Sequence, residues 1–441
     1  MLLKDEFLNG AGLLGASLLY PNSRFRLKCV HDYSALASAM KKTRVPRRSK
    51  SPRAVQELSR LAIGLAASGS RIEDAFWENL LAAKIHAQLR TGDDQNLETA
   101  LDQLYETDPA GYGEFIHAIE AAIECSVLVR GDCNYDVLMF AAPVLTWSRF
   151  SIPSGSIPDA MLASLRTHLR AHVLAADIQF SLADYLFSPD QLPRGYHLTH
   201  ELASKLWVAA TEGHNLHMNS RQLAETGRFL SDTRYLLGAI AVPQGKPMFR
   251  WQEATGASEA ANVPGAKTQK QEILLAWQAC GGEALRPLFQ GCALELLLPD
   301  GFFSAWRMAD RLARPYSMHA TIDFLQSTLN ISADGLRAVI APFYDQWLEE
   351  YRISFTFKDR DDVLYGIVWA LVGEEDESND TVMQIETTLR ECGVTHITLL
   401  DNRFPLEYCE ECGAPLFPNP EGEVVHAEFP EEGKTAPMHL H

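Results

Sequence analysis

The sequence contains no apolar run that approaches the roughly 18 residues of a transmembrane helix. Its nearest approach to a signal peptide, residues 10–20, follows Lys4-Asp5-Glu6, which has no net positive charge, and no clean cleavage site comes after it. These absences disfavour a membrane-spanning or exported protein. We therefore predict a cytoplasmic protein without a membrane partner.

Cysteine is scarce, with 8 in 441 residues, which excludes a small scaffold held together by disulfides. Free thiols are instead expected, and they fit a reducing compartment. The cysteines without motif spacing are Cys29, Cys125, Cys133, Cys280, Cys292 and Cys392.

Basic residues are outnumbered, with 39 Lys and Arg against 57 Asp and Glu, and the formal net charge is -18. An acidic chain disfavours nucleic-acid binding and points to a protein or a small molecule as partner. The exception is segment 41–53, which holds seven basic residues and no acidic one and is compatible with contact to RNA or anionic lipid. A solvated tail is the expected reading of such a run.

Complete catalytic signatures are also missing. The sequence has no P-loop, no nucleophile elbow, no H-E-x-x-H and no dinucleotide-binding glycine motif in its proper context. His197, His200 and His214 lack metal spacing with carboxylates or cysteines. The sequence therefore identifies no enzyme class.

The length predicts two to four domains. Met40 is a candidate true start, because residues 1–39 show no clear periodicity and a sharply different composition begins at residue 40. In chain order we expect a non-native or disordered extension with the basic run (1–50), a helical domain (51–130), three α/β units (131–233, 234–335 and 336–417, the last with the C-x-x-C turn) and an acidic flexible tail (418–441).

The pattern predicts a mixed α+β fold. Ser51-Pro52 is a helix start, and Ser70 with Glu73 has the spacing of a capping box, so the chain should open with a helical bundle. A further helix is expected over residues 318–329. Residues 351–357 alternate in polarity and lead through a short turn to another apolar run at Val363, which predicts an antiparallel hairpin in a mixed sheet.

Three strand–helix–strand units follow the bundle, and each opens near a tyrosine and closes on D-x-x-F. This recurrence predicts an internal duplication. The alternative is chance together with the ordinary alternation of strands and helices in α/β proteins. The closing aspartates Asp184, Asp300 and Asp401 would lie at carboxyl ends of strands, where they can bind a metal ion or act as bases. The competing interpretation is that each accepts hydrogen bonds from backbone amides in a turn.

The strongest chemical signal is Cys409-Glu-Glu-Cys412-Gly413, which resembles half of a zinc ribbon. His426 is the expected third ligand, and His439 or His441 are further candidates. The neighbouring glutamates would raise the thiol pKa values, which disfavours a redox pair. The remaining alternative is a turn that persists without metal.

A second candidate site is the loop that contains Arg149, Ser154, Gly155 and Ser156. It follows an apolar strand and precedes a helix, a position at which α/β proteins often bind anions. The alternative is a rigid turn flanked by prolines and capped by serines.

Distinctive segments lie at residues 140–149, 152–155, 183–193, 232–237, 404–409 and 426–428. Together they resemble a betaproteobacterial family of unknown function, numbered 2863 among the uncharacterised families. The resemblance extends from about Met40 to Glu432 and implies a bacterial, soluble context, but it transfers no catalytic residues.

Two functional hypotheses follow. The first is a non-catalytic binding or regulatory protein with a structural zinc knuckle. The alternative is an enzyme that acts on a small phosphate- or carboxylate-bearing substrate bound at the Ser148–Ser156 loop, with Asp184 or Asp401 as acid or base.

Overall fold

A computed structural model of the chain describes residues 52–148, 152–226, 231–253, 269–345, 347–372, 375, 380–410 and 412–429. The predicted extension over residues 1–50, Arg149, and the tail with His439 and His441 lie outside the described residues. Within the described part, no helix is both long and apolar enough to cross a bilayer.

The described part of the chain opens with helices, as predicted. They are α1 (Arg53–Ala66), α2 (Arg71–Leu89), α3 (Gln95–Thr107) and α4 (Pro109–Glu124). The Ser70 side chain accepts a hydrogen bond from the Glu73 amide at the start of α2, as its spacing predicts. Asp108 caps α4 in the same way and is followed by Pro109 at the first helical position, so local sequence accounts for both helix starts.

A first sheet follows the bundle. Its order is β1 (Cys125–Arg130), β2 (Cys133–Trp147), β5 (Ser231–Pro243), β4 (Gln179–Phe187) and β3 (Gly155–Ser156), and β6 (Ala293–Leu296) and β7 (Asp300–Gly301) also pair with β2. The central strands β2 and β5 are antiparallel from Tyr135↔Pro243 to Trp147↔Ser231. Both faces of this pair are covered, which explains the near-continuous apolar run in β2.

The two faces of the first sheet enter different cores. Along β2, Met139 and Ala141 join one apolar cluster and Phe140 and Ala142 the other, because successive side chains of a strand point to opposite faces. The first cluster also holds α1–α4, α6 (Tyr196–Glu212) and the beginning of α8 (Phe302–Leu329). The second holds α5 (Asp159–His168), the π-helical turn Leu169–Val173 and α7 (Gln269–Leu285).

A second, smaller sheet has the order β10 (Tyr365–Ala370), β9 (Leu348–Phe357), β8 (Leu336–Tyr344) and β11 (His396–Leu399), with β12 (Phe404–Pro405) also paired to β8. Because β9 and β10 are antiparallel while β8 and β11 are parallel, the sheet is mixed. The predicted hairpin is confirmed, and so is the mixed α+β class. The second half of α8 and α9 (Thr381–Glu391) pack against this sheet.

The chain then forms the short hairpin of β13 (Phe417–Pro418) and β14 (Val424–Val425). Residues 418–429, which we expected in a flexible tail, therefore include an ordered strand. Single 3-10 turns complete the description at Pro189–Gln191, Ser220–Gln222, Arg250–Gln252 and Ala333–Gly335.

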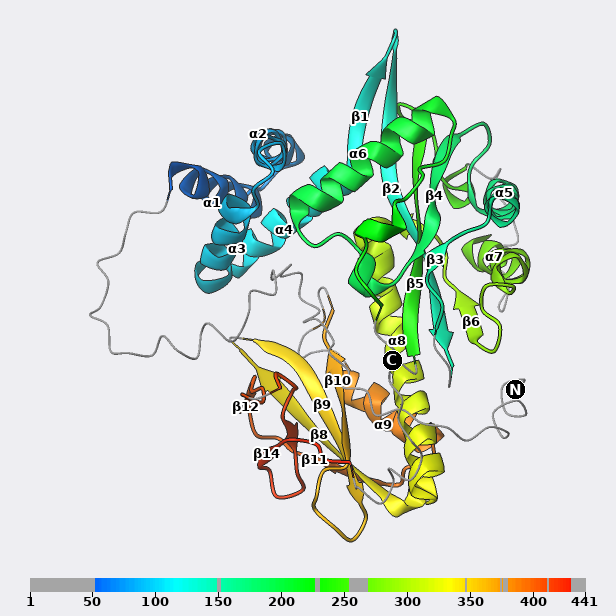
Figure 1. The fold of residues 1–441 in the computed structure, drawn as a ribbon. Coiled ribbons are helices and arrows are strands. Elements are labelled where there is room, and N and C mark those ends of the chain that lie inside the picture. Colours follow the sequence, from blue (N-terminus) through cyan, green and yellow to red (C-terminus); the bar gives the residue numbers. More distant parts are fainter. Residues whose placement is uncertain are drawn as a thin grey trace, which may run out of the picture.

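Helix α8 joins the two sheets (Figure 1). The prediction of a helix over 318–329 was wrong about its start: α8 begins at Phe302, spans 28 residues and contains Pro315 in its interior. Proline removes one helical hydrogen bond, yet here the residues on both sides are held by a core. Phe302 and Ala309 enter the first core, whereas Met318 and Leu325 enter the core of the second sheet.

The first two strand–helix–strand units interlock. Their opening strands β2 and β5 lie at the centre, while β4 flanks β5 and β6 flanks β2. Each unit therefore places its second strand beside the opening strand of the other unit. In the third unit, β10 and β11 are separated by β9 and β8, so its arrangement differs. The internal duplication stays a prediction.

Candidate metal centre and loop network

The Cys409–Gly413 turn lies between two backbone contacts of the C-terminal arm, by which we mean residues 404–429. The Cys409 amide donates to the Ala414 carbonyl at 2.7 Å, and the Gly413 amide donates to the Cys409 carbonyl at 2.8 Å. Gly413 has a φ of 71°, a conformation that glycine adopts without steric cost. The turn therefore presents both thiols from one tight loop.

His426 reaches this turn from the end of the β13–β14 hairpin. Its Nε2 lies 3.2 Å from the Cys412 Sγ, and the donor atoms of Cys409, Cys412 and His426 all lie within 4.8 Å of one another. Tetrahedral zinc, with Zn–S near 2.3 Å and Zn–N near 2.0 Å, places donor atoms about 3.3–3.8 Å apart. Small side-chain rotations would thus close the three donors on one ion. Cys409 is partly buried, and the other two are exposed.

The arm is fastened to the second sheet beside this cluster. The Arg352 side chain is fully buried in β9, and its Nη1 donates to the carbonyls of Glu407 and Leu416, each at 2.6 Å. Its Nε donates to Glu350 at 2.7 Å. Burial raises the pKa of the Glu350 carboxyl, and the charge of Arg352 opposes that rise. The cysteine turn is therefore anchored on both sides by one guanidinium.

Cys392 does not belong to this cluster. Its Sγ lies 3.1 Å from the His319 Nδ1. Burial, with smaller effects of Asp323 and Glu391, raises the pKa of the Cys392 thiol to about 12. A thiol with so high a pKa is a poor nucleophile at neutral pH.

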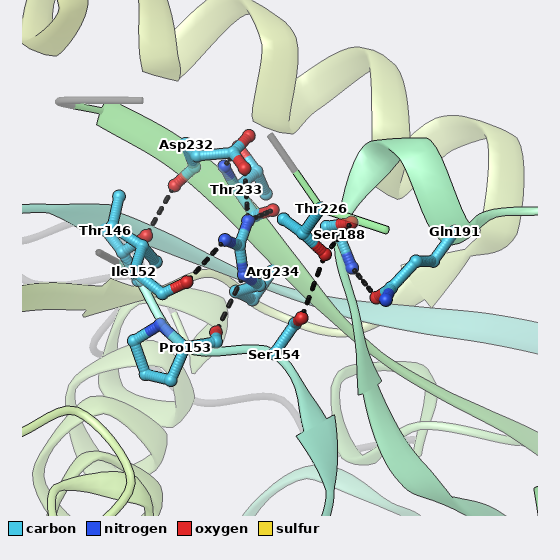
Figure 2. A network of polar contacts seen from close by, with 10 residues as sticks. All are labelled: Thr146, Ile152, Pro153, Ser154, Ser188, Gln191, Thr226, Asp232, Thr233 and Arg234. Carbon is cyan, nitrogen blue, oxygen red and sulfur yellow. Dashed lines mark hydrogen bonds and ion pairs between the residues drawn. The ribbon is translucent and has the colours of Figure 1, made fainter. Parts of the chain in front are cut away.

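The serine loop forms a network around Arg234 (Figure 2). Only 1 % of Arg234 is exposed. Its Nε donates to the Pro153 carbonyl at 2.8 Å and its Nη2 to the Ile152 carbonyl at 2.9 Å, while Nη1 forms an ion pair with Asp232. Burial raises the pKa of Asp232, and Arg234 opposes it. This arginine on β5 supports the loop.

The hydroxyl groups of the loop contact one another. Ser154 Oγ and Ser188 Oγ both lie within hydrogen-bond distance of Thr226 Oγ1, at 3.0 and 3.1 Å. Gly155 and Ser156 form β3 and pair with Leu186 and Tyr185 of β4. The geometry thus gives this loop a structural role, and the anion site there stays a prediction.

The three closing aspartates lie apart. Asp184 accepts a hydrogen bond from the Met218 amide at 2.8 Å and contacts His217, and Asp300 accepts one from the Gly301 amide at 2.9 Å. They belong to β4 and β7, which lie on opposite sides of the β2–β5 pair. Asp401 follows β11 in the other sheet and is exposed. The ladder of β3 and β4 places Asp184 near the serine loop, where its carbonyl accepts from the Ile157 amide at 2.8 Å.

Sequence reasoning overlooked Arg234. The signal in the sequence was the position of Arg234, which directly precedes the apolar run that opens at Tyr235 and lies two residues after Asp232. A buried charge needs a partner, and i and i+2 residues of a strand share a face, so the pair was open to prediction.

Comparison with known proteins identifies one family. Residues 43–440 match the family model described as "Protein of unknown function (DUF2863)". Neither the curated proteins nor the solved structures provide a match.

Proposed function

From the premise that the chain belongs to the DUF2863 family, whose function is unknown, we propose that it is a non-catalytic binding or regulatory protein with a zinc ion in its C-terminal arm. Cys409, Cys412 and His426 would hold the ion. The partner would be another protein or a small molecule.

The observation that carries the proposal is the convergence of three donors from two separate turns. A thiolate pair and an imidazole suit zinc, which is borderline-soft and prefers sulfur and nitrogen. The ion would link the cysteine turn to the end of the β13–β14 hairpin. Because the same arm is held by Arg352, metal occupancy would control how firmly the arm rests on the second sheet.

The set of three leaves a fourth coordination position. Structural zinc sites are almost always four-coordinate, so a further donor is expected. His439 and His441 are candidates by sequence, and water would complete the shell otherwise. Replacing both histidines by glutamine should weaken zinc binding if either one is a ligand, and should leave it unchanged if water is.

The test is elemental analysis and thermal unfolding of the full chain. We expect the double variant Cys409→Ser, Cys412→Ser and the single variant His426→Gln to lose the arm's equivalent of zinc and to unfold at lower temperature. The matched control is Cys292→Ser, because Cys292 is also partly buried but packs against the α5 and α7 side of the first sheet. Equal zinc content and equal melting in the variants and the unaltered protein would remove the proposal.

A further inference from the structure

Two histidines lie where α5 passes into a π-helical turn. His168 is the last residue of α5 and His172 lies within Leu169–Val173. Their rings are stacked, with centroids 6.1 Å apart and an interplanar angle of 12°. π-helical turns are rare and often occur at functional sites. The turn thus keeps two imidazoles side by side.

The histidines lie on the side of the helix away from two arginines. The guanidinium of Arg166 lies 4.3 Å from the centroid of the Phe180 ring, and that of Arg170 lies 5.4 Å from it, so both are directed toward β4. Positions two residues apart on a helix differ by about 200°. The offset therefore keeps positive side chains away from the imidazole pair.

The imidazoles face Cys280 of α7, which packs beside α5 (Figure 1). One nitrogen from each of His168 and His172 and the Sγ of Cys280 lie within 4.8 Å of one another, and all three residues are partly buried. Within the described part of the chain, the structure records no hydrogen bond from any of these three side chains. Their donor atoms are thus available to a ligand.

We propose that His168, His172 and Cys280 form a second metal site, separate from the C-terminal arm, for a borderline divalent transition ion such as Zn²⁺. Two imidazoles and one thiolate are donors that such ions prefer over Mg²⁺ or Ca²⁺. Donor separations below 4.8 Å again require only small rotations to reach the roughly 3.3–3.8 Å of a tetrahedral ion.

The site would join the two interlocked units of the first sheet. His168 ends the helix that precedes β4 and His172 lies in the turn after it, whereas Cys280 lies on the helix between β5 and β6. An ion held by all three would therefore clamp α5 to α7 across the outer face of that sheet. Three protein ligands leave one position open to water or to a small ligand.

The test is metal titration of the full chain after removal of metal by a chelator. With Co²⁺ as the probe, we expect thiolate-to-metal absorption from two independent sites. Cys280→Ser and His172→Gln should each abolish the absorption of the site between α5 and α7. The double variant Cys409→Ser, Cys412→Ser should abolish the absorption of the site in the C-terminal arm. Cys292→Ser and His214→Gln are controls that should retain both. The double variant keeps the two proposals distinguishable, because either site can fail alone.

A second measurement uses the unaltered protein. Zn²⁺ should slow alkylation of the Cys280 thiol severalfold, as followed by peptide mass analysis, while alkylation of Cys292 should keep its rate. If Cys280→Ser and His172→Gln bind Co²⁺ with the stoichiometry and affinity of the unaltered protein, and Zn²⁺ leaves the alkylation of Cys280 unchanged, the second site does not exist.

Discussion

Arg234 is a charged side chain taken almost completely out of water. Its donors are used by Asp232 and by the carbonyls of Ile152 and Pro153, so the residue both neutralises a buried carboxylate and holds a loop. Removing one partner of a buried pair leaves an uncompensated charge, which costs more than the intact pair contributes.

We therefore expect Arg234→Ala to lower the free energy of unfolding by about 3–5 kcal/mol in urea titration. Arg194→Ala is the control, because its ion pair with Asp190 is solvent-exposed and should be worth about 1 kcal/mol or less. Similar small losses for both variants would contradict the role assigned to Arg234.

Glu124 is a buried residue whose protonation should make the stability depend on pH. It accepts a hydrogen bond from the Phe303 amide in the first turn of α8, at 3.0 Å. Burial nevertheless raises its pKa from 4.5 to about 7, with a further contribution from the neighbouring Glu120. The folded protein then holds a proton that the unfolded chain has already released at intermediate pH.

Stability should consequently fall as pH rises from the unfolded pKa to about 7, and stay lower above it. The shift corresponds to about 3 kcal/mol between about pH 5 and about pH 8. Glu124→Gln should lose less stability than the unaltered protein over this range, as measured by urea unfolding at both pH values. Glu114→Gln, on the exposed side of the same helix, should lose as much as the unaltered protein. A parallel pH profile for Glu124→Gln and the unaltered protein would refute the assignment.

At the scale of single residues, the sequence predicted contacts between residues that lie close together along the chain. His426 was identified as a partner of the cysteines because its type and distance along the chain suited a metal, and the structure places it 3.2 Å from Cys412. His168 and His172 also have the i, i+4 spacing of helical metal ligands, but their partner Cys280 lies far away in sequence. The sequence alone therefore gives no signal that Cys280 lies beside the two histidines.

Among the elements, the C-terminal arm depends on one close approach. Gly366 of β10 has no side chain, and a Cβ there would lie 2.4 Å from the ring of Phe417 in β13. The ring therefore rests directly on the backbone of the second sheet. Only glycine at position 366 permits this contact, because any Cβ there would overlap the ring.

We expect Gly366→Ala to displace Phe417 and to loosen the arm, increasing amide hydrogen exchange over residues 412–426 and weakening zinc binding. Gly335→Ala is the matched control, because its nearest foreign atom would lie 3.8 Å away. Unchanged exchange in Gly366→Ala would show that the arm is held independently of this contact.

Element prediction succeeded where signals lie within the element. Ser70 marks a helix start by its own chemistry, and the β9–β10 hairpin follows from alternation and a short turn. The first half of α8 was missed because Pro315 normally ends a helix, and only the two cores that hold α8 on either side overcome that preference. Helix α6 also went unpredicted, although its buried residues recur at helical spacing.

On the scale of the molecule, the helical bundle and the second sheet meet through side chains that are remote in sequence. The Tyr105 hydroxyl on α3 donates to the Glu349 carboxylate on β9 at 2.7 Å. Hydrogen bonds to charged groups contribute more than neutral ones. This bond therefore ties the first core to the second sheet.

We expect Tyr105→Phe to destabilise the protein by about 1–2 kcal/mol and to raise hydrogen exchange in β9. Thr107→Val should change neither quantity appreciably, because the exposed Thr107 hydroxyl donates within α3, to the Gln103 carbonyl at 2.7 Å. Exchange in β9 that is identical in both variants would mean that the two parts are not coupled through Tyr105.

The arrangement of the whole could not be deduced from order along the chain. The three units were expected as consecutive segments, yet β2 pairs with β5 of the next unit rather than with its own β4. Strands that are buried on both faces carry little information about their neighbours, because every apolar partner satisfies them.

The position of Arg352 has a consequence for biosynthesis. Two of its acceptors belong to Glu407 and Leu416, which the ribosome adds 55 and 64 residues later. Until those residues leave the exit tunnel, burial of the guanidinium would leave two of its hydrogen bonds unmade. This disfavours closure of the second sheet around it. We therefore expect the first sheet to form on the nascent chain before the second sheet, which needs the arm to complete the contacts of Arg352.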